Sequence, residues 1–183
     1  QVLYSGGGRV IHKNSEGKLE LCYNTERNIQ VYDKYFNLLK DDSCYIESSR
    51  DDYQSMRRTV FASGRAMMMD GNLDDVSYMR DMKEDFGIVP WPKFDESCDG
   101  YAANVDAGTN LYLVPITTAD AERTSIILEA LSAEGYRSVI PAYYEIALQK
   151  KYTRDDISVQ MIDIIKDSRV FDIGYFFGDL GGW

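Results

Sequence analysis

Apolar and polar residues alternate in two short segments near the start of the chain. Arg9–Lys13 and Lys18–Tyr23 both show this two-residue period, and Asn14–Gly17 lies between them. Because successive side chains of a strand point to opposite faces, the alternation predicts two neighbouring strands. Glycine supplies the backbone freedom that tight turns need, so we expect a β-hairpin with Gly17 at its turn.

Apolar residues spaced three and four apart predict helices further along the chain, because this spacing places side chains on one helix face. The expected faces are Ile29, Tyr32, Phe36 and Leu39; Tyr53, Met56, Val60 and Phe61; Ile127, Ala130 and Leu131; and Ile157, Met161, Ile164 and Ile165. The segment Pro141–Leu148 predicts another helix, with proline at its start. The polar segment 72–83 predicts a further short helix.

Capping residues locate the ends of these helices. The expected N-caps are Asn24 or Thr25, Thr117 or Thr118, and Thr153 or Asp155, and the expected ends are Ser63-Gly64 and Gly135.

The stretch Ala66–Met69 is apolar throughout and stands between Gly64 and Asp70-Gly71. A short continuous apolar run of this kind favours an interior strand that is buried on both faces. Such a strand would bring Asp70 and Gly71 to the sheet edge where open α/β proteins bind ligands. A copper site or an adaptable docking face would instead require exposed methionines, and their exposure would contradict both the buried strand and the ligand-binding function that rests on it.

Two more segments predict strands, namely Phe86–Pro92 and Leu111–Ile116. Strands and helices are therefore interspersed along the chain. This order is typical of the α/β class, in which we expect a mixed sheet flanked by helices. A length of 183 residues fits one α/β unit spanning residues 1–183.

Composition and charge narrow the classes of function. Thirty acidic against twenty basic residues give a net charge of −10, which argues against a nucleic-acid partner because phosphate binding needs a basic surface. Three cysteines, Cys22, Cys44 and Cys98, lack metal-binding spacing, and the sequence does not select a disulfide pair among them. We therefore expect no metal and no cofactor.

Candidate catalytic and metal-binding residues are sparse. His12 is the only histidine and lies in the predicted hairpin, which disfavours a serine–histidine–carboxylate triad. Adjacent carboxylates recur at 41–42, 51–52, 74–75 and 155–156, and a glycoside hydrolase would need two of them across a cleft. Asp95–Asp106 has the glycine and alternating oxygens of a calcium loop, but serine at 97 and the short last aspartate favour a polar surface loop.

Several segments, taken in order, resemble the extracellular solute-binding proteins of sugar-type ABC transporters. The stretch VFASGRAMMMDG (60–71) resembles their F-x-x-G-x-A-M-x-x-x-G segment, and FGIVPWPKFDE (86–96) resembles the strand that follows it. VPITTADAERTSIILEALS (114–132) is similar to their next strand and helix. The stretch from 139 to 174 is similar to the tail of lipoprotein members from Gram-positive gut bacteria.

This resemblance, which covers about residues 61–174, implies a non-enzymatic receptor whose two α/β lobes close around a sugar or oligosaccharide. The chain would be a fragment holding most of the C-terminal lobe, of the type II periplasmic-binding-protein fold, with about 101–147 belonging partly to the other lobe. It would be an extracellular, monomeric lipoprotein of a bacterium, attached to the membrane only by a lipid anchor outside this fragment, and it would deliver its carbohydrate to the permease subunits.

The resemblance also implies ligand-binding residues. Asp70 and Gly71 match the turn from strand to cleft, Tyr101 and Asn104 match the segment that crosses between lobes, and Trp91 ends a strand that points the same way. Asn72 and Leu73 stand where some members place a sugar-stacking aromatic residue. Two other functions stay open: a secreted glycoside hydrolase that uses paired carboxylates, and a secreted adhesion or scaffold module.

Overall fold

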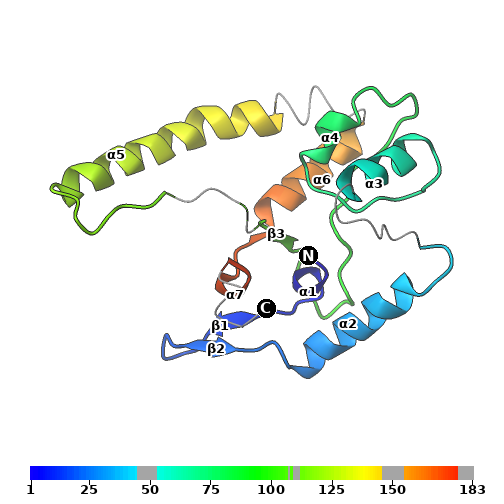
Figure 1. Cartoon of the computed structure of the whole chain (residues 1–183), viewed down its shortest axis with the longest axis horizontal. Helices are drawn as coiled ribbons and strands as arrows, with labels where there is room; N and C mark the ends of the chain where they lie inside the picture. Colours follow the sequence, from blue (N-terminus) through cyan, green and yellow to red (C-terminus); the bar gives the residue numbers. More distant parts are fainter. Residues whose placement is uncertain (45–52, 107, 109–111, 146–154, 177–183) are drawn as a thin grey trace.

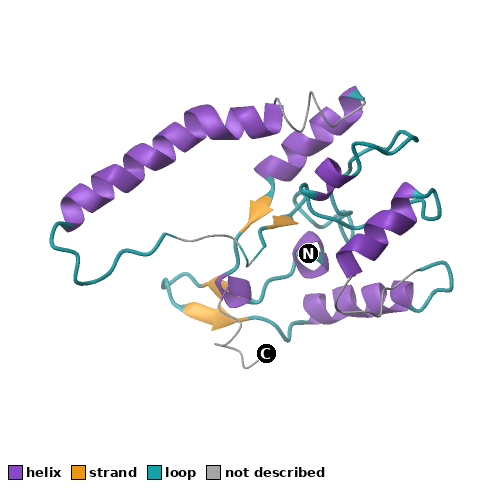
Figure 2. Ribbon diagram, turned by 45° about the horizontal axis from the view of Figure 1, so that its top comes forward, coloured by secondary structure: helices purple, strands orange, loops and turns teal. Residues whose placement is uncertain are grey.

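The computed structural model describes residues 1–44, 53–106, 108, 112–145 and 155–176. Helices predominate, and the strands are short (Figures 1 and 2). In chain order the elements are α1 (Val2–Ser5), β1 (Ile11–Lys13), β2 (Leu19–Leu21), α2 (Glu26–Leu39), α3 (Tyr53–Ala62), α4 (Asp75–Tyr78), β3 (Ala103–Asn104), α5 (Ala121–Glu134), the π-helical turn η1 (Gly135–Val139), α6 (Asp156–Asp167), β4 (Arg169–Val170) and α7 (Ile173–Phe176).

The mixture of helix and sheet agrees with the expected class, but the sheet differs from the predicted one. The described residues form two separate two-stranded sheets: β1 and β2 pair antiparallel, and β3 and β4 pair parallel. The second pair joins Ala103 to Arg169 and Asn104 to Val170. No single mixed sheet flanked by helices runs through the part of the chain that is described.

The predicted hairpin is confirmed, with Ile11 opposite Leu21 and Lys13 opposite Leu19. Asn14 closes the turn, because its Oδ1 accepts the backbone N–H groups of Glu16 and Lys18. Gly17 has a φ of +81°, which glycine adopts without steric cost.

The helix N-caps show how local chemistry starts these helices. Thr25 accepts the backbone N–H of Asn28 at the start of α2, and Asp155 accepts that of Ser158 at the start of α6, as two of the alternative caps predicted. Asp120, rather than Thr117 or Thr118, caps α5. Helix α3 ends as expected, with Gly64 at a φ of +69°.

The stretch Ala66–Met69 is not a buried strand, so this prediction is wrong. Met67 is 86% exposed and Met68 is 80% exposed, and no strand pairs with the segment among the described residues. An apolar run needs neighbouring strands on both sides to become an interior strand. Those neighbours are lacking here, so the segment follows α3 along the surface.

Two other predicted strands are also absent. Phe86–Pro92 has no strand residue, and the N–H of Ile88 donates to Ser158 Oγ of α6 at 2.9 Å instead of to a strand. Leu111 lies outside the described residues, while residues 112–116 form no strand and Ile116 is fully exposed.

The helix that begins at α5 does not stop at Gly135. Helical backbone continues from residue 121 to 145, through the π-helical turn η1 and across Pro141, so no new helix begins at the proline. A π turn shifts the hydrogen-bond register by one residue, and such turns accommodate local departures from α-helical bonding. In contrast, the segment 72–83 forms only the short helix α4.

The core centres on Ile162 of α6, which is 0% exposed. It packs with Val76 of α4, and Leu73, Phe86, Ile88 and Tyr144 surround this pair. A second buried group joins α1 to α2 through Leu3, Tyr4 and Val31. The predicted helix faces are only partly correct, since Ile29, Phe36, Ile127, Leu131 and Ile157 are between 49% and 66% exposed.

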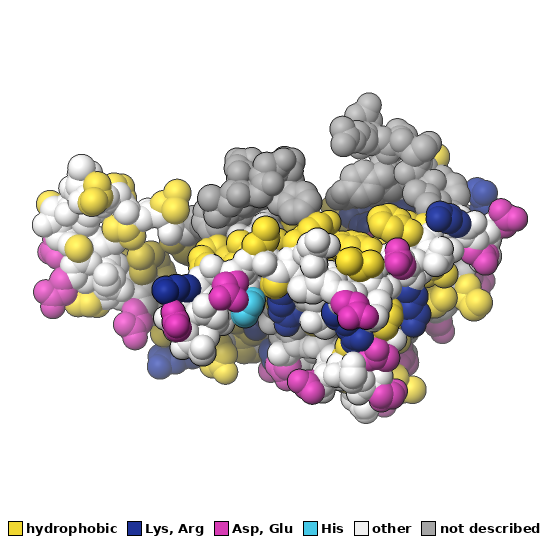
Figure 3. All heavy atoms as spheres, turned by 90° about the horizontal axis from the view of Figure 1, so that it is seen from below, with side chains coloured by type: hydrophobic (Ala, Val, Ile, Leu, Met, Phe, Trp, Pro, Cys, Tyr) yellow, Lys and Arg dark blue, Asp and Glu magenta, His cyan; other side chains and the backbone are white. Residues whose placement is uncertain are grey.

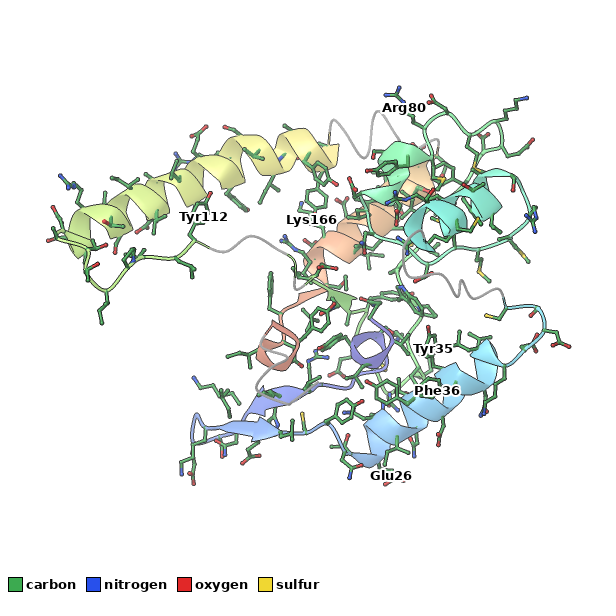
Figure 4. The ribbon with its side chains drawn as sticks, in the orientation of Figure 1. Glu26, Tyr35, Phe36, Arg80, Tyr112 and Lys166 are labelled. Atoms are coloured by element: carbon green, nitrogen blue, oxygen red, sulfur yellow. The ribbon has the colours of Figure 1, made fainter. Side chains whose placement is uncertain are left out.

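Helix α5 and the segment before it lie apart from the other helices (Figures 1 and 2). None of the side chains of α5 is buried. In Figure 4, Tyr112 lies on the extended segment that leads to this helix, and it is 82% exposed. We call residues 112–139 the α5 arm; beyond it, Tyr144 returns to the core around Ile162. No described helix is both long and apolar enough to span a bilayer.

Candidate functional site

A pocket opens where the loop after α1, the first turn of α2 and the loop before β3 meet. Its volume is about 500 Å³, within the range of small-molecule sites. The side chains that matter for its chemistry are Tyr4, Arg9, Arg27, Cys98, Asp99 and Tyr101. The pocket therefore combines two aromatic rings, two cations, a thiol and a carboxylate.

Arg27 forms a fixed wall of this pocket. Its Nη1 and Nη2 donate to the two oxygens of Asp95 at 2.7 and 3.0 Å, and its Nε donates to the Gly6 carbonyl at 2.7 Å. The guanidinium also lies 4.6 Å from the centre of the Phe94 ring. These contacts join three segments, and the hydrogen bonds from Arg27 hold the pKa of Asp95 well below its usual range. Asp95 therefore neutralises the charge of Arg27.

Arg9 differs from Arg27 because its guanidinium makes no ion pair in the described part of the chain. Its Nη1 donates to the Gly8 carbonyl at 2.7 Å, and its guanidinium carbon lies 5.8 Å from the centre of the Tyr4 ring. Among the residues that the structure describes, no carboxylate oxygen lies within 4.0 Å of this guanidinium. Arg9 thus offers the pocket a half-buried cation with free donors.

The two tyrosines contribute in different ways. Tyr4 is only 4% exposed, and its ring meets that of Tyr175 edge-on at 6.4 Å. Its buried hydroxyl has no hydrogen-bond partner among the described residues, and burial raises the pKa of this group. Tyr101 is 41% exposed and presents its ring at the pocket wall.

Cys98 lies at the inner side of the pocket and is 7% exposed. Its sulfur accepts from Arg27 Nη2 at 3.1 Å and contacts the Ser5 carbonyl at 3.9 Å. Burial alone would raise the pKa of the thiol, but backbone hydrogen bonds at Asp95 and Phe94, together with Arg27, lower it overall. Cys22 and Cys44 are also free thiols.

Of the five ligand-binding residues that the sequence predicts, only Tyr101 lines this pocket. Asn104 lies nearby in β3, where its N–H donates to Gln1 Oε1 at 2.7 Å and its own Oδ1 is buried without a partner in the described structure. Trp91 is half-buried in the loop between α4 and β3 and is not part of the pocket wall.

Asp70 and Gly71 belong to a separate charged cluster. The Asp70 carbonyl accepts from Arg57, whose Nη2 also pairs with the buried carboxylate of Asp75 at 2.7 Å. Arg58 pairs with the other oxygen of Asp75. A side chain at Gly71 would meet Asp75 Oδ2 at 2.6 Å, so the glycine makes room for this ion pair. Neither described sheet includes residues 66–71, so Asp70 and Gly71 do not stand at the sheet edge that the sequence predicts.

The sequence did not point to Arg9, Arg27 and Tyr4, and it indicated Asp99 only as part of a possible calcium loop. A signal for part of this group stands in Gly6-Gly7-Gly8-Arg9, because a glycine triplet before an arginine indicates close backbone packing beside a charge. Gly7 has a φ of +81°, and a side chain there would lie 3.6 Å from Cys98 Sγ.

Other candidate residues have structural roles. Asp95 of the loop 95–106, which the sequence favours as a polar surface loop, accepts from Arg27 and from the N–H and hydroxyl of Ser97. His12 lies at the surface beside acidic side chains, with its Nε2 3.6 Å from Glu20 Oε2 (Figure 3). The described residues contain no group of three or more histidine, cysteine or acidic side chains arranged to hold a metal ion.

Comparison with known proteins identifies no relative: no family model, curated protein or solved structure matches this chain.

Proposed function

We propose that this chain is part of an extracellular receptor that binds a sugar or oligosaccharide and delivers it to the permease of an ABC transporter. The pocket between α1, α2 and β3 is the observation that carries this proposal. The exposed ring of Tyr101 suits the C–H face of a sugar, while Arg9 and Asp99 suit sugar hydroxyls. The proposal therefore rests on this pocket and no longer on the buried strand expected at Ala66–Met69, which the structure lacks.

The location and partners in this proposal rest on the resemblance in the sequence. From the same resemblance we propose a type II lobe, a lipid anchor and permease subunits as partners. The acidic net charge suits a soluble protein that binds no nucleic acid.

The paired carboxylates give little support to a glycoside hydrolase. Asp75 is buried between two arginines, Asp155 caps α6, and Asp41 accepts the N–H and hydroxyl of Ser43. Each of these residues thus supports local structure. Asp51 and Asp52 lie outside the described residues.

A sugar screen tests the proposal. Binding to the folded state alone raises the melting temperature, by about 5–10 °C at a hundredfold excess of ligand over its Kd. Isothermal titration of the best sugar should then show that Tyr101→Ala weakens binding about tenfold, whereas Tyr112→Ala on the α5 arm leaves it unchanged. Release of hydrolysed sugar would instead indicate an enzyme. Absence of a shift with every mono- and oligosaccharide would contradict the receptor.

One observation favours a second candidate, the adhesion or scaffold module. The α5 arm exposes large apolar side chains that the described part of the body does not cover, including Leu113, Ile126 and Tyr136. In the sugar screen this candidate predicts no ligand-dependent stabilisation, so one experiment distinguishes the two.

A further inference from the structure

The charge balance of the pocket indicates which sugars it selects. Arg27 is neutralised by a two-pronged pair with Asp95. Arg9 has no such partner in the described structure. The buried carboxylate of Asp172 is engaged by the backbone, because it accepts the N–H groups of Val10, Ile11 and Gly174. Arg9 therefore has no ion-pair partner among the described residues, and Asp99 lines the pocket with it.

The backbone of Arg9 is held in place before any ligand binds. Its carbonyl accepts Asn28 Nδ2 at 2.9 Å and the Cys22 thiol at 3.3 Å, while its guanidinium stays close to the Tyr4 ring. A planar guanidinium fixed in this way suits a carboxylate, because two parallel N–H groups match two carboxylate oxygens.

Asp99 restricts the ligand further. It is an exposed carboxylate on the pocket wall, and it accepts hydrogen bonds from hydroxyl groups. The same carboxylate repels a multiply charged group such as phosphate more strongly than it repels a single carboxylate. A ligand that satisfies both Arg9 and Asp99 carries one carboxylate together with several hydroxyls.

We propose that the pocket selects acidic sugars, with the carboxylate of a hexuronate bound by Arg9 and its hydroxyls bound near Asp99 and Tyr101. This inference rests on the proposed sugar-binding function and specifies its substrate class.

Paired titrations of glucuronate against glucose and of galacturonate against galactose test the inference. The uronates should bind at least about tenfold more tightly than the neutral sugars, and added NaCl should weaken only uronate binding. Arg9→Gln should remove the preference, Arg9→Lys should keep part of it, and Arg123→Gln, an exposed arginine on the α5 arm, should leave it intact.

The other outcomes are distinct. Equal binding of uronate and neutral sugar, unchanged by Arg9→Gln, would overturn the acidic-sugar inference and leave the receptor in place. Tight binding of inorganic phosphate in preference to uronate would also overturn it. No binding of any sugar would overturn the proposed function, and the inference with it. Circular dichroism of each variant separates loss of binding from loss of folding.

Discussion

At the scale of single residues, the buried amide of Asn28 holds three parts of the backbone together. Its Nδ2 lies 2.9 Å from the carbonyl oxygens of Arg9, Cys22 and Tyr23, and the side chain is 1% exposed. The amide thus fixes the loop that carries Arg9 against both the hairpin and α2.

Replacing this amide should destabilise the protein measurably. Asn28→Ala leaves buried carbonyls without a donor, so we expect the free energy of unfolding to fall by about 2–3 kcal/mol in urea titrations. Asn37→Ala provides the matched control, because Asn37 is exposed on the same helix and its loss should change stability by no more than about 0.5 kcal/mol. Equal effects of the two substitutions would contradict the role assigned to Asn28.

Asp172 is a second buried residue whose side chain satisfies the hydrogen bonds of buried backbone groups. It is 2% exposed and accepts N–H groups from both β1 and the start of α7. Asp172→Ala should lower the free energy of unfolding by about 2–4 kcal/mol, since backbone donors would stay buried and unsatisfied. The exposed Asp167 at the end of α6 is the control, and a loss of similar size in Asp167→Ala would argue against this explanation.

At the scale of elements, α6 depends on one fully buried side chain. Ile162 fills the space against Val76 and Phe86, and its truncation would leave a cavity. We expect Ile162→Ala to lower the free energy of unfolding by about 2–5 kcal/mol. Ile157→Ala on the same helix should have little effect because Ile157 is 66% exposed. Chemical denaturation of both variants checks this contrast.

The cap of α6 makes stability depend on pH. The hydroxyl and N–H of Ser158 donate to Asp155 and hold the pKa of its carboxyl below the ordinary value. The stabilisation is therefore complete above about pH 4 and is lost as the pH falls below it. Unfolding free energies measured from pH 6 to pH 2 should fall less steeply in Asp155→Asn, which does not titrate. Identical pH profiles would show that the cap contributes nothing.

The sequence correctly predicted those elements that depend on interactions between residues close together in the chain. Gly17 needs only its own φ to close the hairpin, and Thr25 and Asp155 cap helices through residues three positions away. The predictions of interior strands were wrong because an apolar run does not show which other segment it will pair with. The backbone of Ile88 bonds to Ser158, seventy positions away, and no period in the sequence encodes that choice.

The candidate site was also only partly predictable from the sequence. Tyr101 was predicted, but Arg9 and Arg27 were missed because the pocket joins segments that are about seventy to ninety positions apart in the chain. Asp70 was assigned to a sheet edge that depended on a buried strand at Ala66–Met69. Once that strand is absent, Asp70 lies beside the Arg57–Asp75 pair instead.

At the scale of the whole molecule, the α5 arm is the least anchored part of the described structure. Tyr112, Leu113 and Ile116 are more than 80% exposed, and Met67 and Met68 are exposed elsewhere on the surface. Apolar side chains also reach the surface in a broad band in Figure 3. Met67 and Met68 therefore have the exposure that an adaptable docking face requires.

The arm should exchange its amide hydrogens faster than the body. Helix α5 buries no side chain, whereas α6 buries Ile162 and Ser158, so local opening of α5 requires less free energy. Hydrogen–deuterium exchange followed by mass spectrometry should show weaker protection of residues 121–134 than of 156–167. Equal protection would mean that the arm is covered in solution.

The parallel pairing of β3 with β4 has a consequence for how the molecule transmits movement. The chain continues from β3 to the arm, and α6 later leads directly into β4. Two backbone hydrogen bonds join these strands: Ala103 N–H donates to the Ser168 carbonyl at 2.9 Å, and Val105 N–H donates to the Val170 carbonyl at 3.1 Å. Outbound and inbound strands are thus clamped side by side, two residues after Tyr101. Movement of α5 would therefore reach the pocket rim through β3 and the interior around Ile162 through Tyr144, which packs against that cluster.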